Sequence, residues 1–408
     1  MSAALQIPLS AAADGLIQAL HRKTGARSLA ALSGATLLGE RAILRSMRVP
    51  ATTSANGSCH LFDAIGDRVA VNLARTSDLD LLPALLESSD TFVPHRLPPL
   101  IVLVRECDAS TLVSRGRQLG MAVARESEQT TISGSTAVET GTLVDEVAVE
   151  LTRGGIARRD RSSARVLDLS ALWAGPLATH LLWMAGAEVI RVEHRGRPDA
   201  MRNGDAEFFA LLNQGKASVA LDFGDVNDIK ALLALIASSD IVVEASRPRA
   251  LHQLGIDAAQ LTSTLPGLVW VTITGHGASG EAADWIGFGD DCGIAAGLSA
   301  ELRLAAGRSG FVGDAIADPL TGIAAALAAW SRWESGRGGR IGIAMRHTVA
   351  RCVQAERASD MNAWTASLRS WAAAQGEAFP SVERRARTAP VAPLGADNHR
   401  FLSGVANA

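Results

Sequence analysis

The residue with the clearest chemical potential is an aspartate that precedes a long Ala-rich stretch. Asp318 lies in the segment GDAIADPLTG (313–322), and a helix is expected over 319–333. Asp before Pro is an ordinary helix start, in which the carboxylate serves as the N-cap. The same position suits chemistry, because the helix dipole and the free backbone N–H groups keep a carboxylate ionised and therefore nucleophilic. The local sequence is compatible with both roles.

A glycine-rich segment follows a late predicted strand over 268–274. Gly275, Gly277 and Gly280 form a GxGxxG pattern, but residues 281–289 contain more glycine and no sustained helical period. A dinucleotide site requires a helix to open at this point, so that its N-terminus can hold the pyrophosphate. The pattern therefore favours a ligand-binding loop at the carboxyl end of a strand over an NAD site.

Several basic residues could bind a phosphate, and most of them follow the carboxyl ends of predicted strands, although each alone is more typical of a solvated surface charge. They are Arg191, Arg195, Arg197, Arg202, Lys216 and Arg247. His194, His252 and His276 have no partner at a metal-ligand spacing, so no metal site is predicted. The GxSxG motif of serine hydrolases is absent.

Composition excludes several classes of protein. The 408 residues include 48% hydrophobic and 20% charged residues, which is typical of a globular chain. A net charge of −3 argues against nucleic-acid binding. No apolar run is long enough to cross a membrane. The four cysteines never form a CxxC pair, so we expect free thiols and the reducing cytoplasm.

The elements that must position these residues divide the chain into three parts. Residues 1–150 are expected to form one small α+β domain that includes a strand over 100–105, and a linker is expected over 126–163. Residues 164–350 alternate strands with helices of about a dozen residues, which predicts right-handed βαβ units and a doubly wound, mainly parallel α/β domain. Residues 351–408 are expected to add a helix and an extended tail that wraps the large domain.

Successive segments of the large domain resemble the family III CoA-transferases, also called the CaiB/BaiF family. The resemblance rests on seven segments in order: VLDLSALWAGPLATHLLWMAGAEVIRVE (166–193), PDAMR (198–202), LNQGKASVALDF (212–223), DIVVEASRPRALHQLGI (240–256), VTITGHGASG (271–280), ADPLTGIAAALAAW (317–330) and SGRGGRIGIAM (335–345). One segment would be weak evidence. Together they imply a Rossmann-like CoA-binding domain and transfer of CoA between acids, with neither a metal nor a redox cofactor.

The resemblance implies a role for Asp318, which falls on the family's catalytic aspartate. Its carboxylate would attack an acyl-CoA thioester to give a mixed anhydride and then an aspartyl-CoA thioester, and a small carboxylic acid would reverse the steps. The N–H groups of the loop 275–280 would stabilise the oxyanion. Acyl-CoA and a small carboxylic acid are therefore the expected substrates.

The resemblance also implies where CoA would lie. The matching positions are Leu172, Trp173, Ala174, His194, Arg195, Arg202, Lys216 and Arg247, with Gly275 and Gly277 from the glycine loop. The chain departs from the family pattern at two of these places. Ala245 replaces an Asn, and His194 replaces a residue that is often basic, so contacts to the nucleotide are weaker there.

Two other readings of the same resemblance remain. The racemase branch of the family uses a His in the segment that aligns with 287–291, and Phe288 occupies that position. Because Phe cannot carry a proton, an α-methylacyl-CoA racemase-like activity is disfavoured. A non-catalytic CoA-binding or scaffold protein is the alternative from a different class.

The order of the segments differs from that of the family. There the AGP motif lies near the N-terminus, whereas here it follows residue 170. Residues 56–75 and 115–124 resemble parts of the family's small domain. We therefore predict that the small domain precedes the large one, as in a circular permutation, with the active-site cleft between them. The resemblance implies a homodimer.

Overall fold

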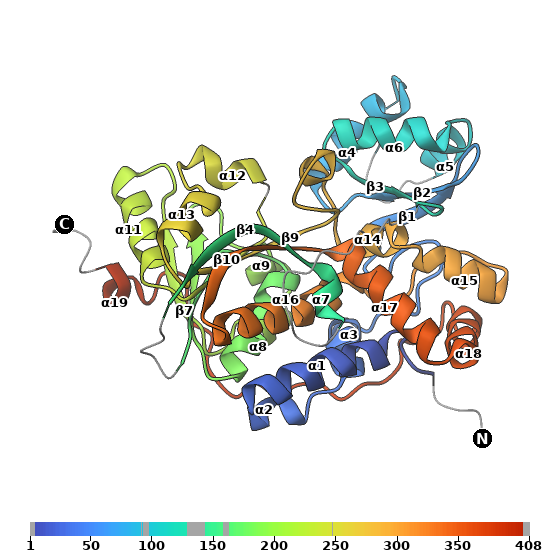
Figure 1. The fold of residues 1–408 in the computed structure, drawn as a ribbon. Helices are drawn as coiled ribbons and strands as arrows, with labels where there is room; N and C mark the ends of the chain where they lie inside the picture. The colour runs from blue at the N-terminus through green and yellow to red at the C-terminus, as the bar shows by residue number, and fades with distance from the viewer. Residues whose placement is uncertain are drawn as a thin grey trace.

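The computed structural model describes residues 5–90, 92, 98–128, 143–157, 163–246 and 248–402. The chain is an α/β protein with two sheets, and Figure 1 shows them in separate lobes. The sheet of seven strands lies toward the left of that view, and the sheet of three strands lies at the upper right. Among the described helices, none has the length and apolar character needed to span a membrane.

The seven-stranded sheet has the order β4-β10-β9-β8-β5-β6-β7, and all its neighbours are parallel except β4 and β10. Strand β5 is followed along the chain by β6 on one side and later by β8 on the other. The order therefore reverses between β5 and β8, where open α/β sheets bind ligands. The strands are β4 Ala148–Ile156, β5 Arg165–Asp168, β6 Glu188–His194, β7 Ala217–Leu221, β8 Ile241–Glu244, β9 Val269–Thr274 and β10 Arg337–Ala344.

Helices cover both faces of this sheet, as the buried apolar strands require. Alternate strand residues divide the core: Val166 packs with the helices α8 and α16, whereas Leu167 packs with α11. Nearly every residue of α16 is buried, and Gly322 lets it approach α8 closely, since a Cβ there would lie 2.7 Å from the Ala174 oxygen. The helices from residue 144 onward are α7 Val144–Val147, α8 Ala174–Met184, α9 Met201–Gly204, α10 Ala206–Asn213, α11 Val226–Ala237, α12 Pro248–Gln253, α13 Ala258–Thr264, η1 Glu281–Asp284 (3₁₀), α14 Gly289–Ala295, α15 Leu298–Ala306, α16 Ala317–Glu334, α17 Met345–Ser359, α18 Met361–Ala373 and α19 Asn398–Leu402.

The smaller sheet is antiparallel and carries three helices on one face. Its elements are β1 Cys59–Asp63, β2 Arg68–Asn72, β3 Ala122–Arg125, α4 Thr76–Leu86, α5 Pro98–Arg105 and α6 Ala109–Gln118. The other face packs on α14, where Leu61 and Ala124 meet Ile294 and Ala295. The side chain of Asn72 donates to Asp291 on α14 at 2.8 Å. Helix α14 therefore joins the two lobes.

Three helices precede the small sheet: α1 Ser10–Thr24, α2 Arg27–Ala30 and α3 Gly34–Leu44. They lie beneath the large sheet in Figure 1, and their apolar residues share the core that contains α16. Within the range 1–150, the three helices therefore pack with the large sheet, whereas residues 59–125 have a core of their own. The tail returns to the large sheet, where Asp397 accepts a hydrogen bond from the backbone N–H of Ser218.

The strand predicted over 100–105 is wrong, because these residues form α5. The run Leu-Ile-Val-Leu-Val has no polar residue to reveal its period. Burial shows the period: Leu100 and Val104, four residues apart, are buried, while Val102 is 58% exposed. A strand would have placed all three on the same face, whereas a helix turns Val102 outward.

The linker predicted over 126–163 is also wrong in part, because residues 148–156 form the edge strand β4. Its charged, Gly-rich sequence is compatible with the half-exposed edge of a sheet. Gly154 is required there, since a Cβ would overlap the backbone of Gly338 and Gly339 on β10. Residues 129–142 and 158–162 of the predicted linker lie outside the described residues.

Candidate active site

Asp318 lies at the start of α16, but it is not the N-cap. Helix α16 begins at Ala317 after Ile316, so Asp318 is the second residue of the helix, and no side chain caps this end. Its neighbours in the first turn are buried, whereas Asp318 itself is half-buried and lines a cavity. The expectation that Asp318 caps the helix is therefore wrong, and its carboxylate is available for another role.

Backbone N–H groups from two other elements hold the Asp318 carboxylate. Ala174, the first residue of α8, and Gly289, the first residue of α14, both donate to it. A Cβ at Gly289 would overlap Asp318 Oδ2 and the Ala315 oxygen, so only glycine allows this close approach. Three helix N-termini therefore converge on one carboxylate, and each favours its negative charge.

Burial opposes that charge. Desolvation raises the pKa of Asp318 to about 6, against the lowering by Arg41 and by the two N–H groups. Asp314 also raises this pKa by charge repulsion. A carboxylate with a pKa of about 6 is largely ionised at neutral pH and is more nucleophilic than an ordinary aspartate.

A cluster of buried carboxylates surrounds Asp318. Arg41 from α3 forms a bidentate ion pair with Asp314, at 2.8 and 2.5 Å, and lies 4.5 Å from the centre of the Trp173 ring. Burial, followed by repulsion from Asp314, raises the pKa of Asp290 to about 8. One guanidinium therefore balances one of the carboxylates, and Asp290 stays mostly protonated at neutral pH.

The cavity in front of Asp318 has a volume of about 270 Å³ and lies at the carboxyl ends of β5, β8 and β9, where the strand order reverses. One lining residue, Arg75, comes from the segment between β2 and α4 of the small sheet. The described lining residues are Arg75, Ala171, Leu172, Ala174, Gly175, Ala245, Ser246, Ile273, Thr274, Gly275, Ala283, Asp284, Trp285, Ile286, Gly287, Phe288, Asp318 and Met345.

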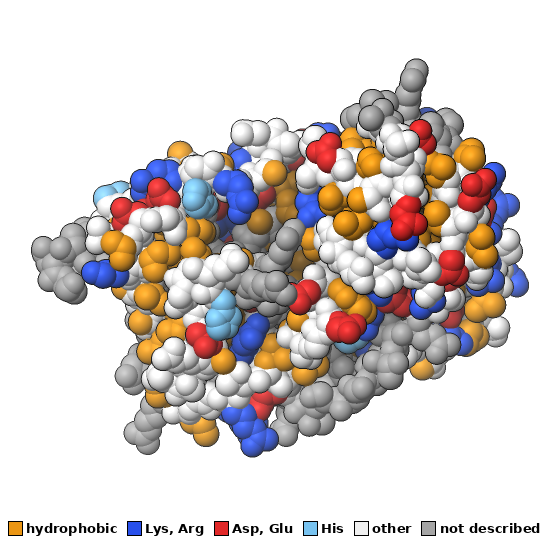
Figure 2. Space-filling model, turned by 90° about the horizontal axis from the view of Figure 1, so that it is seen from above, with side chains coloured by type: hydrophobic (Ala, Val, Ile, Leu, Met, Phe, Trp, Pro, Cys, Tyr) orange, Lys and Arg blue, Asp and Glu red, His pale blue; other side chains and the backbone are white. Residues whose placement is uncertain are grey.

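A wider cavity of about 750 Å³ continues from this one, because Asp284 and Trp285 line both. Its other walls include Arg117 and Arg125 of the small lobe and Gln253 of α12. The two cavities give a ligand a path from the space between the lobes to Asp318. Figure 2 shows one face of the molecule, on which acidic and basic side chains are interspersed.

Leu172 has a backbone conformation that non-glycine residues rarely adopt, with a φ of 66°. Its N–H donates to Asp199 at 3.0 Å, and Asp199 also accepts from the buried Arg191 at 2.6 Å. This buried ion pair fixes the turn that carries Leu172 and Ala174 along the cavity. Strain of this kind is found where a binding loop must be held in one shape.

The structure brings Leu172, Ala174 and Gly275 of the sequence-predicted residues to the cavity of Asp318. Lys216, in contrast, does not line this cavity. Its ammonium is buried and donates hydrogen bonds to Asp168, Thr179, Asn213 and the Pro176 oxygen. A phosphate cannot reach this ammonium, so Lys216 is a structural residue.

Trp173 also departs from its predicted role. Its side chain is buried between Arg41 and the edge of Phe208, and it does not line the cavity. The tryptophan therefore supports the cluster of carboxylates from behind.

The other predicted CoA contacts lie away from the described cavity walls. His194 accepts from the N–H of Gly196, and Arg195 is exposed beside Asp228. Arg202 forms an ion pair with Glu193 at 2.5 Å and stacks on Phe209. Gly277 is not among the lining residues, and Arg247 lies outside the described residues.

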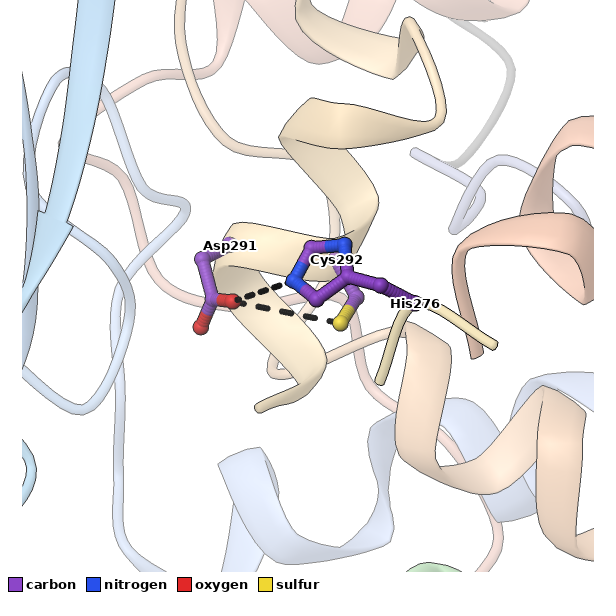
Figure 3. A group of neighbouring side chains, drawn as sticks. All are labelled: His276, Asp291 and Cys292. Atoms are coloured by element: carbon purple, nitrogen blue, oxygen red, sulfur yellow. Dashed lines mark hydrogen bonds and ion pairs between the residues drawn. The ribbon is translucent and has the colours of Figure 1, made fainter. Parts of the chain in front are cut away.

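A buried group of three side chains behind the cavity was missed by sequence reasoning. Figure 3 shows His276, Asp291 and Cys292 pointing toward one another, with Asp291 Oδ2 at 3.9 Å from His276 Nε2 and 3.8 Å from Cys292 Sγ. They are donors of the types that bind zinc. Asp291 also holds the lobes together, because its Oδ1 accepts from Asn72 and from the N–H of Phe288. Fifteen residues separate His276 from Asp291, so no short motif could reveal the group.

Comparison with known proteins places the chain among CoA-transferases. Residues 162–383, more than half of the chain, match the family model of CoA-transferase family III. Succinyl-CoA:glutarate CoA-transferase of Mus musculus is 30% identical over 153 residues, which are 36% of this chain and 34% of that protein. Formyl-CoA:oxalate CoA-transferase of Afipia carboxidovorans is 34% identical over 123 residues, which are 28% of this chain and 29% of that protein. The chain thus spans about a third of the length of these relatives.

Two solved structures can be matched to about half of the chain. A hypothetical protein from Mycobacterium tuberculosis matches at 27% identity, with a TM-score of 0.43, over 50% of this chain and 61% of that one. A CaiB/BaiF family protein from Brucella suis matches at 25% identity, with a TM-score of 0.41, over 49% of this chain and 56% of that one. On the family match and the α/β architecture, the chain belongs to CoA-transferase family III.

Proposed function

We propose that this chain is an enzyme that transfers CoA from an acyl-CoA thioester to a small carboxylic acid, with Asp318 as the nucleophile. The observation that carries the proposal is the position of Asp318: a half-buried carboxylate at the end of a cavity, held by the N–H groups of Ala174 and Gly289. A desolvated, fixed carboxylate is suited to attack on a thioester carbonyl. The relatives named above are CoA-transferases, which supports the same reaction class.

In the first half of the reaction, a carboxylate oxygen of Asp318 bonds to the thioester carbonyl carbon. The C–S bond then breaks, and CoA leaves as the thiolate. The thiolate next attacks the Asp318 carbonyl of the mixed anhydride, the donor acid leaves as a carboxylate, and an aspartyl-CoA thioester remains. The acceptor carboxylate repeats these steps in reverse, which regenerates the free Asp318 carboxylate, so no net proton or electron is exchanged.

The cavity is suited to this cycle because both intermediates are destroyed by water. The apolar walls and the small volume leave little room for water beside the acyl group. The N–H groups of Ala174 and Gly289 would also face the negative charge that develops on the Asp318 carboxyl group when thiolate attacks it.

The racemase-like alternative requires a histidine at a position of the cavity wall that phenylalanine occupies. Phe288 lines the wall at the position where that branch of the family has its His, and a phenyl ring moves no proton. The non-catalytic alternative makes a different prediction, namely that CoA binds without forming any covalent adduct. The experiment on Asp318 therefore separates it from the transferase.

We propose acyl-CoA and a carboxylic acid as the only small-molecule partners, with no permanently bound cofactor. We also propose a homodimer in the cytoplasm. The free state of all four cysteines supports a reducing compartment.

Replacement of Asp318 by Asn should abolish CoA transfer, with a loss of at least about 10³-fold in kcat, because an amide cannot form the anhydride. Asp257→Asn is the matched control, since Asp257 caps α13 away from the cavity and Asn is an equally good cap. Mass spectrometry after incubation with acyl-CoA and hydroxylamine should find a hydroxamate on Asp318 of the wild-type protein only. Turnover retained by Asp318→Asn would show that Asp318 is not the nucleophile.

A further inference from the structure

The wall that an acyl group would meet beside Asp318 is mostly apolar. Ile273, Trp285, Ile286, Phe288 and Met345 all line the cavity. Trp285 is held in place on both sides, because the Arg117 guanidinium lies 3.8 Å from its ring centre and the His276 ring meets it edge-on at 5.8 Å. A wall fixed in this way cannot easily turn a polar group toward the ligand.

The single positive charge among the described lining residues belongs to Arg75, and that charge is already matched. Arg75 Nε and Nη2 donate to Asp78 Oδ1 at 2.9 and 2.5 Å, and Nη2 also donates to the Gly120 oxygen at 2.8 Å. Asp78 is completely buried and the Arg75 side chain is 29% exposed, so water screens the pair only in part. Arg75 therefore connects α4 to the turn that follows α6, and offers little net charge to a ligand.

The other ionisable side chains among the described lining residues are acidic. Asp284 and Asp318 both line the cavity. The free carboxylate of a diacid would therefore meet the carboxylate of Asp318, one matched arginine and a mostly apolar wall. The hydroxyls of Ser246 and Thr274 are the neutral polar side chains among the described lining residues, so the carboxylate would exchange its full hydration for few partners. A methyl group in the same position would lose nothing.

On these grounds, and resting on the proposed CoA transfer, we propose that the acyl group handled by this chain is short, uncharged and apolar, and that diacids are discriminated against. The volume of about 270 Å³ lies near the lower end of ligand cavities, which span about 300–1,000 Å³. The named relatives act on glutarate and oxalate, so this chain would differ from them in substrate class. Apolar contact with Trp285 and Phe288 supplies the selection.

The test compares butyryl-CoA with succinyl-CoA as donors, with propionate as the acceptor for both. The two donors share a four-carbon chain and differ by one terminal carboxylate. We expect kcat/KM to be at least tenfold higher for butyryl-CoA, which is about the effect of one well-placed group in a binding pocket. Equal or better transfer from succinyl-CoA would overturn the substrate class and leave CoA transfer standing. Absence of transfer and of a covalent adduct with both donors would overturn the proposed function itself.

A single substitution tests the part played by the matched arginine. Asp78→Asn removes the charge that neutralises Arg75 while keeping an oxygen for the N–H of Arg75. The ratio of kcat/KM for succinyl-CoA to that for butyryl-CoA should then rise about tenfold. Asp108→Asn is the control, because Asp108 also begins a helix of the small lobe and does not line the cavity.

An unchanged ratio in a folded Asp78→Asn protein would contradict the neutralisation argument. The comparison of donors on the wild-type protein stands whether or not this variant folds.

Discussion

At the scale of single residues, the chemistry of Asp318 depends on a balance between burial and donated hydrogen bonds. Burial alone would keep the carboxyl group protonated and inert. The N–H groups of Ala174 and Gly289 and the charge of Arg41 pull in the other direction, which leaves a pKa of about 6. The side chain is therefore ionised at neutral pH, yet poorly solvated, and poor solvation favours attack on a carbonyl carbon.

This balance predicts the pH profile of the enzyme. The reactive form is the ionised carboxylate, so kcat/KM should be constant above about pH 7 and fall by about tenfold per pH unit well below 6. Initial rates from pH 4.5 to 8.5 measure the profile, with circular dichroism at each pH to show that the fold persists. A plateau that extends down to pH 4.5 would mean that Asp318 titrates like an ordinary exposed aspartate.

The residue scale also shows what sequence could and could not provide. Asp318, Leu172, Ala174 and Gly275 were found because each lies in a short segment with a recognisable pattern, and all four line the cavity. Arg75 was missed as a site residue, because 243 positions separate it from Asp318 and the resemblance of residues 56–75 to the family's small domain assigns no role to its last residue. Lys216, which immediately precedes β7, was misplaced, because a basic residue between two elements looks the same in sequence whether it faces a phosphate or the buried Asp168.

At the scale of elements, α14 determines the geometry of the site. Its first residue donates to Asp318 and has no room for a side chain, since a Cβ would overlap Ala315 and Asp318. Its third residue, Asp291, binds Asn72 of the small lobe. Sequence analysis did not predict this helix, because the segment GFGDDCGIA has three glycines in nine residues and a weak period.

Gly289→Ala should therefore reduce activity much more than its helix propensity would suggest. The added methyl group displaces the Asp318 carboxylate or the start of α14, and we expect kcat to fall by at least about 10²-fold. Gly293→Ala in the same helix is the matched control, because the nearest atom to its Cβ, Ile316 Cγ2, lies at an ordinary 3.6 Å. Initial rates and melting temperatures of both variants separate a loss of activity from a loss of stability. Equal activity in the two would contradict the close approach.

Helix α5 is an element that sequence analysis predicted with the wrong secondary structure. The segment LIVLVR (100–105) is predicted as a strand, because β-branched residues favour extended backbone. The two prolines at the start of α5 suit the first turn of a helix equally well. Packing of Leu100 and Val104 against the small sheet decided the outcome, and local sequence does not contain that information.

At the scale of the whole molecule, the feature to explain is the order of the lobes along the chain. The small sheet, residues 59–125, precedes the large one, and its one face packs on α14. The mainly parallel arrangement of the large sheet was predictable, because strands and helices alternate from residue 165 onward. The packing of α1–α3 on α16 was not predictable, since their apolar faces would suit either lobe. The circular permutation remains our proposal.

We expect the protein to form a homodimer despite this altered order. Light scattering coupled to size-exclusion chromatography should give twice the chain mass of 42.6 kDa. A concentration series from low to high micromolar separates a stable dimer from a weak one. A mass of a single chain throughout that range would contradict the dimer.

Helix α14 also couples two equilibria, ligand binding in the pocket and docking of the small lobe. One end of it shapes the pocket around Asp318, and one side of it carries the small lobe through Ile294, Ala295 and Asp291. A ligand that stabilises the position of α14 therefore also stabilises the docking of the small lobe. Because coupling is reciprocal, docking of the small lobe strengthens ligand binding by the same free energy. Leu61 packs on α14 and does not line the cavity, so a substitution of Leu61 changes ligand affinity as well as stability.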